Sequence, residues 1–365
     1  MPTIEDLLLP HISRLKTYQG VSPSETLAEE AGISLEQVIR LNGNENPYGP
    51  SPQVAEALGN FRDYNHYPDP AQRRLRGSLS EYLGVPEDNI VAGNGSDEII
   101  DLLMRMFLAP GDEIIIPVPT FGMYSFSADV AGAHAVAVRR DDSFDIDIEA
   151  IKGAINPRTK AIFFPSPNNP TGNLVTESQA RALLDTGLLV VADEAYYDFC
   201  GQTLMPLLPE YRNLVVLRTF SKWAGLAGLR IGAGAMDSEL AATMMGVKPP
   251  YNVNLAAEVA LLASLEDTSN LLERVDAIVQ ERGRMYRLLC DIPGITVWPS
   301  QANFILCKMP EGRGREVYEA MCRRGVFLRY FDNELLRDYI RSSVGKPEET
   351  DAVIAGFRAV LGVDA

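Results

Sequence analysis

The chain has 365 residues, of which 46% are hydrophobic and 22% charged, which is typical of a globular protein of two or three domains. Its formal net charge of −16 excludes sequence-independent binding of nucleic acid, which needs a basic surface. An anionic substrate must therefore be bound by a local group of arginines that acts against the overall field of the protein.

Cysteine and histidine usage favours a protein without disulfides and without a metal site. The three histidines lie far apart in the sequence, so no metal site is predicted. There is no secretory signal and no membrane-spanning apolar run, and we expect a cytoplasmic protein with no membrane partner. The cysteines include no C-x-x-C pair and are typical of reduced thiols: Cys200, Cys290, Cys307 and Cys322.

The first fifty residues are predicted to form an arm and a loop. Residues 1–20 carry apolar side chains at helical spacing, so we expect a helix or arm that packs on its own domain or on a partner subunit. Ser34 is placed to cap a short helix that ends near Ile39. Residues 41–52, LNGNENPYGPSP, form an irregular loop whose three asparagines offer hydrogen-bond donors.

Helices and strands alternate from about residue 53. Most strands are short apolar runs such as AIFF and LLVVA, which are typical of strands buried on both faces of a mostly parallel sheet. This alternation predicts a doubly wound α/β domain, in which ligands bind beyond the carboxyl ends of the strands. The expected helices are residues 52–60, 71–83, 97–107, 121–131, 147–155, 176–185 and 237–246. The expected strands are residues 89–92, 112–116, 134–138, 160–164, 188–192, 213–218 and 229–235.

The pattern changes after about residue 250 and predicts a smaller α+β unit. One long helix is expected over residues 253–291. It is followed by expected strands at residues 295–298, 302–308, 326–329 and 338–343 and by expected helices at residues 313–323 and 348–361. No internal repeat or low-complexity segment is present.

The most informative stretch is residues 213–231, NLVVLRTFSKWAGLAGLRI. Lys222 follows an apolar strand directly and precedes Arg230 by eight residues. A lysine in this position is suited to form a Schiff base with an aldehyde cofactor, while nearby hydroxyls and the arginine hold a phosphate. Taken alone, the stretch is better explained by a solvated surface lysine.

Three other loops after strands carry polar groups of the same kind. In VAGNGSDEII a strand runs through Gly95 into a helix, whose free N–H groups are suited to bind phosphate, although an ordinary capped turn explains this segment equally simply. In FFPSPNNPTG the side chain of Asn169 is held before Pro170, which turn chemistry alone also explains.

In LLVVADEAYYDF the third loop places Asp193 at the tip of a buried strand, with Tyr196 three residues further on. An aspartate there acts as a helix N-cap or, in a crevice of low dielectric, requires a cationic partner such as a pyridinium nitrogen. The combination of a phosphate cradle, a buried acid, a phenol and an amine predicts pyridoxal phosphate as the cofactor.

The same motifs resemble a known family over nearly the whole chain. GNGSDE, SPNNPTG, VVADEAYYDF and TFSKWAGLAGLRIG are similar to those of the fold-type-I, class-II pyridoxal-phosphate aminotransferases. LNGNENPYGPSP, NHYPDP and PTFGMY resemble the histidinol-phosphate aminotransferase group of that family. The resemblance implies an α/β fold with an N-terminal arm and loop (1–50), a large cofactor-binding domain (51–252) and a small C-terminal α+β domain (253–365).

The resemblance also implies a role for individual residues. Lys222 resembles the lysine that holds the cofactor and moves the proton at the substrate's Cα, and Asp193 resembles the partner of the pyridine nitrogen. Asn169 and Tyr196 resemble the donors to the ring oxygen. Phe121 resembles the residue that stacks on the ring, although many relatives have tyrosine there. The implied phosphate ligands are Gly95, Ser96, Asp97, Thr219, Ser221 and Arg230, together with Tyr67 from the other subunit of a homodimer with shared active sites.

For the substrate, the resemblance implies two anion-binding arginines, Arg329 and Arg341, and a tyrosine of the arm, Tyr18, that closes over the substrate, with Asn169 nearby. Guanidinium groups pair with a phosphate or a carboxylate alike. The expected reaction is that of histidine biosynthesis, in which histidinol phosphate and 2-oxoglutarate give imidazole-acetol phosphate and glutamate. Without the resemblance, Arg329 is equally well explained as a surface charge.

Three alternatives remain at this stage. An aromatic amino-acid aminotransferase shares most of the motifs, and Phe121 and Trp223 are suited to line an apolar pocket for it. A pyridoxal-phosphate-dependent phosphoamino-acid decarboxylase keeps the fold and changes the reaction. A non-catalytic regulator with an aminotransferase-like domain needs an additional basic DNA-binding module, for which the chain has neither the length nor the charge.

Overall fold

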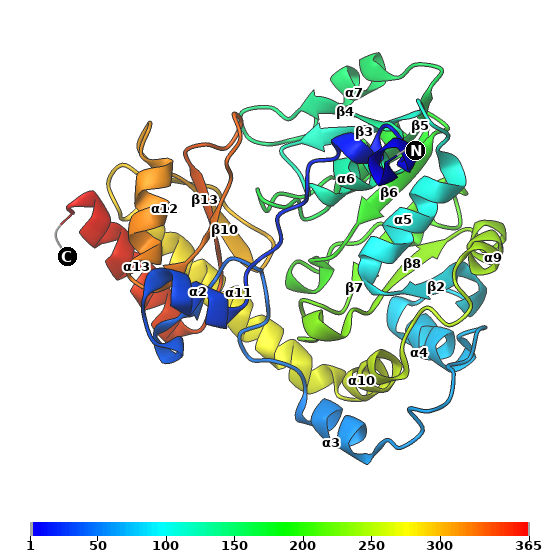
Figure 1. Ribbon diagram of the computed structural model, residues 1–365, viewed down its shortest axis with the longest axis horizontal. Helices are drawn as coiled ribbons and strands as arrows, with labels where there is room; N and C mark the ends of the chain where they lie inside the picture. The colour runs from blue at the N-terminus through cyan, green and yellow to red at the C-terminus, as the bar shows by residue number, and fades with distance from the viewer. Residues whose placement is uncertain (1–2, 364–365) are drawn as a thin grey trace.

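The computed structural model describes residues 3–363. A seven-stranded sheet with helices on both faces forms the larger part of the molecule, and a four-stranded sheet with its own helices lies beside it (Figure 1). Hydrophobic runs in the sequence produce the large sheet, because six of its strands are completely buried or nearly so.

The large sheet has the strand order β2-β8-β7-β6-β5-β3-β4. All of its neighbouring strands pair in parallel except β8, which is antiparallel to both β2 and β7. The prediction of a mostly parallel, doubly wound sheet is therefore confirmed. The strands are β2 (Ile90–Gly93), β3 (Glu113–Val118), β4 (His134–Arg139), β5 (Thr159–Pro165), β6 (Leu189–Asp193), β7 (Leu214–Thr219) and β8 (Gly232–Met236).

Side chains of successive residues in these strands enter different cores. One face of the sheet carries α5 (Gly95–Phe107), α6 (Met123–Val130) and α9 (Ser238–Val247), and the opposite face carries α7 (Ile148–Ala154) and α8 (Glu177–Leu184). Val191 of β6 packs with residues of α5, α6 and α9, whereas its neighbours Val190 and Ala192 pack with residues of α8. This alternation decides which polar residues at the strand ends share a face.

Capping residues fix where several helices begin. Thr176 accepts a hydrogen bond from the backbone N–H of Gln179, whose side chain returns the bond in a capping box, at the start of α8. Ser51 caps α3 (Pro52–Asn60), and Asn254 caps α10 (Leu255–Glu266). The helices expected between residues 52 and 250 are confirmed within two residues at each end, including α4 (Arg73–Leu83).

The second unit is built around an antiparallel sheet of order β12-β13-β10-β9. Its elements are β9 (Thr296–Val297), β10 (Phe304–Lys308), α12 (Gly314–Cys322), β11 (Val326–Phe327), β12 (Arg329–Tyr330), β13 (Tyr339–Ser343) and α13 (Pro347–Leu361). The strand expected over 326–329 is in fact two strands, because Leu328 separates β11 from β12 and the two pair with different neighbours.

The single helix expected over 253–291 is wrong. The structure has two helices there, α10 and α11 (Thr268–Cys290), with a break at Asp267. The carboxylate of Asp267 is buried and accepts hydrogen bonds from Ser51 and Asn270, which stabilises the break by tertiary contacts. The first of these helices, α10, packs on α3 and α4, which belong to the part of the chain before residue 252. The division into two domains after residue 252 therefore stays a prediction.

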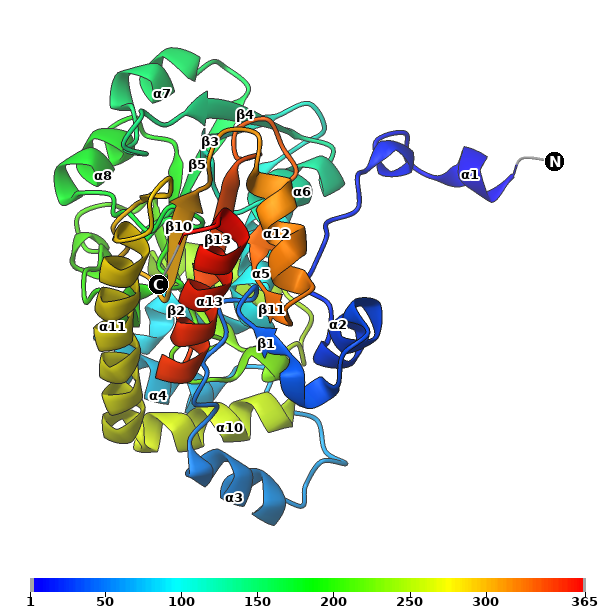
Figure 2. The ribbon, with the colours of Figure 1, turned by 90° about the vertical axis from the view of Figure 1, so that its left-hand side faces the viewer.

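The N-terminal part differs from the expectation mainly at α2 (Ser24–Ala31), which was not expected. Among residues 3–20, the arm contains the short helix α1 (Ile4–Leu7) and a 3-10 helix (Ile12–Arg14). Ser34 caps a short 3-10 helix (Leu35–Gln37), as expected, but this helix ends before Ile39, and β1 (Ile39–Arg40) then pairs with β11. In Figure 2 the segment with α1 extends away from the body of the molecule. Among residues 3–363, no helix combines the length and the apolar composition that a membrane crossing requires.

Candidate active site

A cavity of about 690 Å³ lies where the carboxyl ends of the large sheet meet the arm and the second unit. Every residue predicted to belong to the site lines this cavity, except Gly95 and Tyr67. The predicted residues that line it are Tyr18, Ser96, Asp97, Phe121, Asn169, Asp193, Tyr196, Thr219, Ser221, Lys222, Arg230, Arg329 and Arg341.

One end of the cavity is shaped for a phosphate. Gly95 begins α5 with a φ of +74°, and a Cβ at this position would lie 2.6 Å from a guanidinium nitrogen of Arg230. Arg230 itself has a φ of 55°, an unfavourable value for a residue with a side chain, and this conformation ends the 3-10 turn before β8. Its guanidinium bonds Asp97 at 2.9 Å and Ser221 at 3.4 Å. The free N–H groups at the start of α5 and the guanidinium of Arg230 therefore lie side by side, as in a phosphate-binding site.

Hydroxyl groups complete this end of the cavity. Thr219 Oγ1 donates a hydrogen bond to Ser221 Oγ at 3.0 Å, directly after β7 ends. Gly232 of β8 allows α5 to approach, because a Cβ there would lie 2.5 Å from the backbone nitrogen of Ser96. The strand expected over 229–235 begins only at Gly232, since the positive φ of Arg230 turns the chain first. These donors fit a phosphate group.

The same cavity holds a buried acid. Asp193 is 4% exposed, and its carboxylate accepts hydrogen bonds from the hydroxyl of Tyr124 at 2.8 Å and the backbone N–H of Ala195 at 3.1 Å. Burial raises the pKa of Asp193 to about 6, against the opposite effect of the Tyr124 hydrogen bond. No arginine or lysine of residues 3–363 forms an ion pair with it, so a cationic ring nitrogen would supply the missing partner.

The amine predicted to be the nucleophile also lies in the cavity. Lys222 Nζ donates a hydrogen bond to the carbonyl oxygen of Gly43 at 3.1 Å, which holds the side chain against the irregular N-terminal loop. Burial lowers the pKa of Lys222 to about 8, and the charge of Arg341 acts in the same direction. An amine with a lowered pKa is a better nucleophile and a better proton acceptor at neutral pH.

Two further predicted residues are fixed by hydrogen bonds across the cavity. Tyr196 receives a hydrogen bond from Asn44 Nδ2 at 2.9 Å, and burial raises its pKa to about 12, so the phenol stays protonated. Asn169 Oδ1 accepts a hydrogen bond from Arg341 at 2.7 Å. Phe121 lies edge-on to the ring of Tyr124, with 5.6 Å between the ring centres.

The two predicted substrate arginines face each other on neighbouring strands. Arg329 of β12 is directly opposite Arg341 of β13, and like charges in this arrangement repel. Arg341 is buried, and among the described residues it bonds only the oxygens of Asn169 and Asn42 and keeps its Nε without a partner. Burial and the charge of Arg329 lower the pKa of Arg341 to about 10. Within residues 3–363 neither arginine pairs with a carboxylate, so an anionic ligand would relieve the repulsion.

The two predicted tyrosines lie in different surroundings. Tyr18 lines the cavity and is edge-on to Phe121, with 6.4 Å between the ring centres, and Arg329 donates to the carbonyl of Gln19 at 3.2 Å. Tyr67 does not line the cavity of its own chain. It is 79% exposed and stacks on Tyr251 at 4.5 Å. The structure thus joins the arm to the site but leaves Tyr67 on the surface.

Sequence reasoning missed Tyr124 and left the role of Asn44 open. Tyr124 lies in the PTFGMY motif, but only the packing of α6 against β3 and β4 of the large sheet brings its hydroxyl to Asp193. Asn44 belongs to the asparagine-rich loop, and it receives its role from a contact with Tyr196, 152 residues away. Glu45, in the same loop, also lines the cavity and bonds Arg40.

Comparison with known proteins identifies the class to which this fold and site belong. The model of the family described as aminotransferase class I and II matches residues 36–357. The chain therefore belongs to the class I and II aminotransferases, a pyridoxal-phosphate-dependent family. The predicted cofactor and fold are both confirmed.

Within this family, the chain is similar to several proteins named histidinol-phosphate aminotransferase. The chain is 46% identical to the histidinol-phosphate aminotransferase of Roseiflexus castenholzii, over 98% of this chain and 99% of that protein. It is 43% identical to the chloroplastic histidinol-phosphate aminotransferase of Nicotiana tabacum, over 96% of this chain and 86% of that protein. A crystal structure of the histidinol-phosphate aminotransferase of Sinorhizobium meliloti in complex with pyridoxal 5'-phosphate matches with a TM-score of 0.85, 26% identity and 97% coverage of both chains.

The lowered pKa of Lys222 predicts unusual reactivity of this amine. Without cofactor, its reaction with acetic anhydride should rise with pH around a midpoint of about 8, because the neutral amine is the reactive form. At pH 7 roughly one molecule in ten would carry the neutral amine, far more than for a lysine with an ordinary pKa. Competitive labelling with peptide mass analysis measures this, with the more exposed Lys160 as the internal control. A midpoint for Lys222 near the value of an ordinary lysine, about 10.4, would contradict the prediction.

Proposed function

We propose that the protein transfers the amino group of histidinol phosphate to 2-oxoglutarate, giving imidazole-acetol phosphate and glutamate. Relatives at 46% and 43% identity that carry the name histidinol-phosphate aminotransferase support this proposal. The observation that carries it is a single cavity that holds an activated lysine, a buried acid without a cationic partner and two arginines without a carboxylate.

The residues present fit pyridoxal phosphate. The cradle at Gly95, which a Cβ would fill, and the cation of Arg230 suit its phosphate, and the buried Asp193 suits its ring nitrogen. When bound, the cofactor supplies an aldehyde that carries the amino group and a ring that accepts electrons from the substrate's Cα. The residues that would hold it are Gly95, Ser96, Asp97, Phe121, Asn169, Asp193, Tyr196, Thr219, Ser221, Lys222 and Arg230.

Each residue of the protein then has a defined task. Lys222 would hold the cofactor's aldehyde, and its Nζ is the base placed to remove and return the proton at the substrate's Cα. Asp193 would keep its negative charge beside the ring nitrogen, because a cation beside a carboxylate lowers its pKa. Tyr196, protonated and held by Asn44, would be the donor to the ring oxygen. Tyr18 covers the cavity and restricts the access of water.

The facing arginines bind the anionic group of each substrate in turn. Arg341 is already fixed by Asn169 and Asn42, and its free Nε offers one more donor. Arg329 bonds only backbone carbonyls of the arm, so it is able to exchange these bonds for a phosphate. A planar guanidinium can donate paired hydrogen bonds to the phosphate of one substrate and to the carboxylate of the other.

The active enzyme is proposed to be a cytoplasmic homodimer in which Tyr67 reaches the phosphate of the partner's cofactor. In support, Tyr67 is exposed and lies outside the cavity of its own chain. Apolar side chains of the arm are also exposed and offer a surface to a second copy: Ile4, Leu7, Leu8 and Leu9. The division into an arm, a large domain (51–252) and a small domain (253–365) belongs to the same proposal.

Replacing Arg341 by Gln should lower kcat/KM about a hundredfold or more for histidinol phosphate and for glutamate alike, since losing one partner of a buried charged contact costs about 2–5 kcal/mol. The Arg329→Gln variant should lose less, about tenfold, because this side chain is only half-buried and bonds only carbonyl oxygens. Steady-state kinetics with both donors measures the effect, and Arg212→Gln, in an exposed ion pair, is the control. An Arg341 variant that loses only one of the two substrates would contradict a shared anion site.

A substrate panel with 2-oxoglutarate as acceptor tests the proposal directly. We expect kcat/KM for histidinol phosphate to exceed that for phenylalanine and tyrosine by about 10²-fold or more, because a phosphate carries up to two negative charges to balance the two facing arginines, whereas the carboxylate of an amino acid carries one. A preference for phenylalanine would favour the aromatic aminotransferase. Release of carbon dioxide from phosphothreonine would favour the decarboxylase.

A further inference from the structure

A second buried network lies directly behind the cofactor site, on the opposite face of the sheet. Asp193 of β6 pairs with Leu217 of β7, so the next residues along the two strands, Glu194 and Arg218, also face each other. They form an ion pair of 2.8 Å although Glu194 is only 1% and Arg218 only 5% exposed. Arg218 Nε makes a second contact with the same carboxylate at 3.0 Å.

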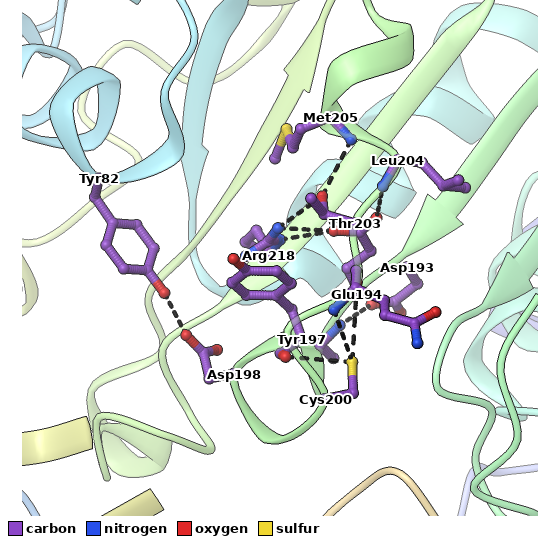
Figure 3. A network of polar contacts seen from close by, with 12 residues as sticks. Tyr82, Asp193, Glu194, Tyr197, Asp198, Cys200, Thr203, Leu204, Met205 and Arg218 are labelled. Atoms are coloured by element: carbon purple, nitrogen blue, oxygen red, sulfur yellow. Dashed lines mark hydrogen bonds and ion pairs between the residues drawn. The ribbon is translucent and has the colours of Figure 1, made fainter. Parts of the chain in front are cut away.

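Both oxygens of the Glu194 carboxylate are fully engaged, as Figure 3 shows. One accepts a hydrogen bond from the backbone N–H of Leu204 at 2.6 Å, and the other accepts one from Thr203 Oγ1 at 2.7 Å. The guanidinium of Arg218 also donates to Thr203 Oγ1 at 3.0 Å and lies 3.5 Å above the ring of Tyr197. The pair is thus held from two sides by neighbouring loops.

The position of this pair along the strands is what connects it to catalysis. Side chains alternate between the faces, so Asp193 and Thr219 point into the cavity while Glu194 and Arg218 point away from it. Glu194 follows the ring-facing acid directly, and Arg218 precedes the phosphate-binding hydroxyl of Thr219 directly. Three residues after Thr219 comes Lys222. The ion pair therefore joins the two backbone segments that hold the two ends of the cofactor.

We propose that Glu194 and Arg218 are positioning residues, whose ion pair fixes the distance between Asp193 and the segment from Thr219 to Lys222. This inference rests on the proposed use of the cavity by pyridoxal phosphate. Catalytic groups need to be held within a fraction of an ångström, and this two-point contact, in which two guanidinium nitrogens of Arg218 bond one oxygen of Glu194, Oε2, restrains both distance and orientation.

Stability alone does not explain this pair. Removing two charges from water is costly, and apolar residues of similar volume usually stabilise a core as well or better. Burial raises the pKa of Glu194, and Arg218 counteracts this effect. The charge of Glu194 also raises the pKa of Asp193, so a neutralising cation behind the site helps Asp193 to stay ionised. The other titratable groups around Arg218 are Tyr197, Cys200 and, on the side of α4, Asp198 with its hydrogen bond to Tyr82.

The test uses variants that separate the effect of the ion pair on the stability of the fold from its effect on cofactor binding. Glu194→Gln and Arg218→Met each leave one buried charge alone, and both should lower the melting temperature. The double variant Glu194→Gln/Arg218→Met removes both charges and should recover most of the stability. It should still bind pyridoxal phosphate about tenfold or more weakly than the wild type, because the cross-link between the strand ends is absent. Arg218→Lys, which keeps the charge but loses the two-point contact, should fold and show the same weakening.

Cofactor affinity is measured by titrating the cofactor-free protein with pyridoxal phosphate and following fluorescence, and stability by thermal unfolding. The control is Glu113→Gln/Arg158→Met, which removes an ion pair of 2.5 Å between Glu113 of β3 and Arg158, the residue before β5, at the other end of the sheet. It should leave cofactor affinity unchanged. If the double variant at 194 and 218 and Arg218→Lys both bind cofactor as the wild type does, the positioning role is refuted. Since this readout involves no amino donor, failure of the proposed substrate would leave it unaffected.

Discussion

Replacing Lys222 by Ala should abolish transamination, with a loss in kcat of about 10³-fold or more, because the group that removes and returns the substrate proton is missing. The variant should also lose the visible absorption band of the lysine-bound cofactor and should not be labelled at this position when the loaded protein is reduced with borohydride. Kinetics, absorption spectra and peptide mass analysis provide three independent measurements.

The control is Lys160→Ala. Lys160 lies at the amino end of β5, where it pairs with Asp112 at 3.7 Å, and it does not line the cavity. This variant should keep the wild-type rate and spectrum. If Lys222→Ala retained transamination at a rate near that of the wild type, the assignment of the amine would be wrong.

The second large effect is expected at Asp193. Asp193→Asn preserves the size of the side chain and removes the charge that faces the ring nitrogen. We expect kcat to fall by about 10²–10³-fold, the range found when a preorganised electrostatic partner of a reaction is lost. Cofactor affinity should fall as well, because the buried site then contains no anion to balance a cationic ring.

Tyr124→Phe provides the matched comparison. It removes the 2.8 Å hydrogen bond to Asp193 but leaves the carboxylate in place. Because that hydrogen bond lowers the pKa of Asp193, its loss should raise the pKa of the carboxyl and shift the acidic limb of the kcat/KM profile to higher pH. The loss of rate near pH 8 should stay below about tenfold. An Asp193→Asn variant as active as Tyr124→Phe would show that the charge is not needed.

The sequence predicted the large sheet well because its strands are continuous apolar runs between turn residues. The strand over 188–192 became β6, and its neighbours pair with it in parallel. The order of the strands in the sheet and the antiparallel direction of β8 depend on contacts between segments far apart in the sequence. The local pattern of apolar residues does not contain this information. The break at Asp267 was missed for the same reason, since Ser51, which stabilises it, lies 216 residues away.

The site residues likewise fall into those that the local sequence indicates and those that only the folded structure brings together. Lys222, Asp193 and the start of α5 stand out locally, because polar or glycine residues interrupt apolar runs at strand ends. The direct opposition of Arg329 and Arg341 arises from the register of two short strands, and the contact of Tyr124 with Asp193 arises from the packing of α6. Glu194 and Arg218 were not singled out, since a charged residue within an apolar strand does not reveal which face it occupies.

A crystal structure of the protein loaded with pyridoxal phosphate would test the central claim most directly. We predict continuous density from Lys222 to the cofactor, with the ring nitrogen within hydrogen-bonding distance of the Asp193 carboxylate and the phosphate at the start of α5. A cofactor attached to a different lysine, or a ring nitrogen that faces away from Asp193, would contradict the account.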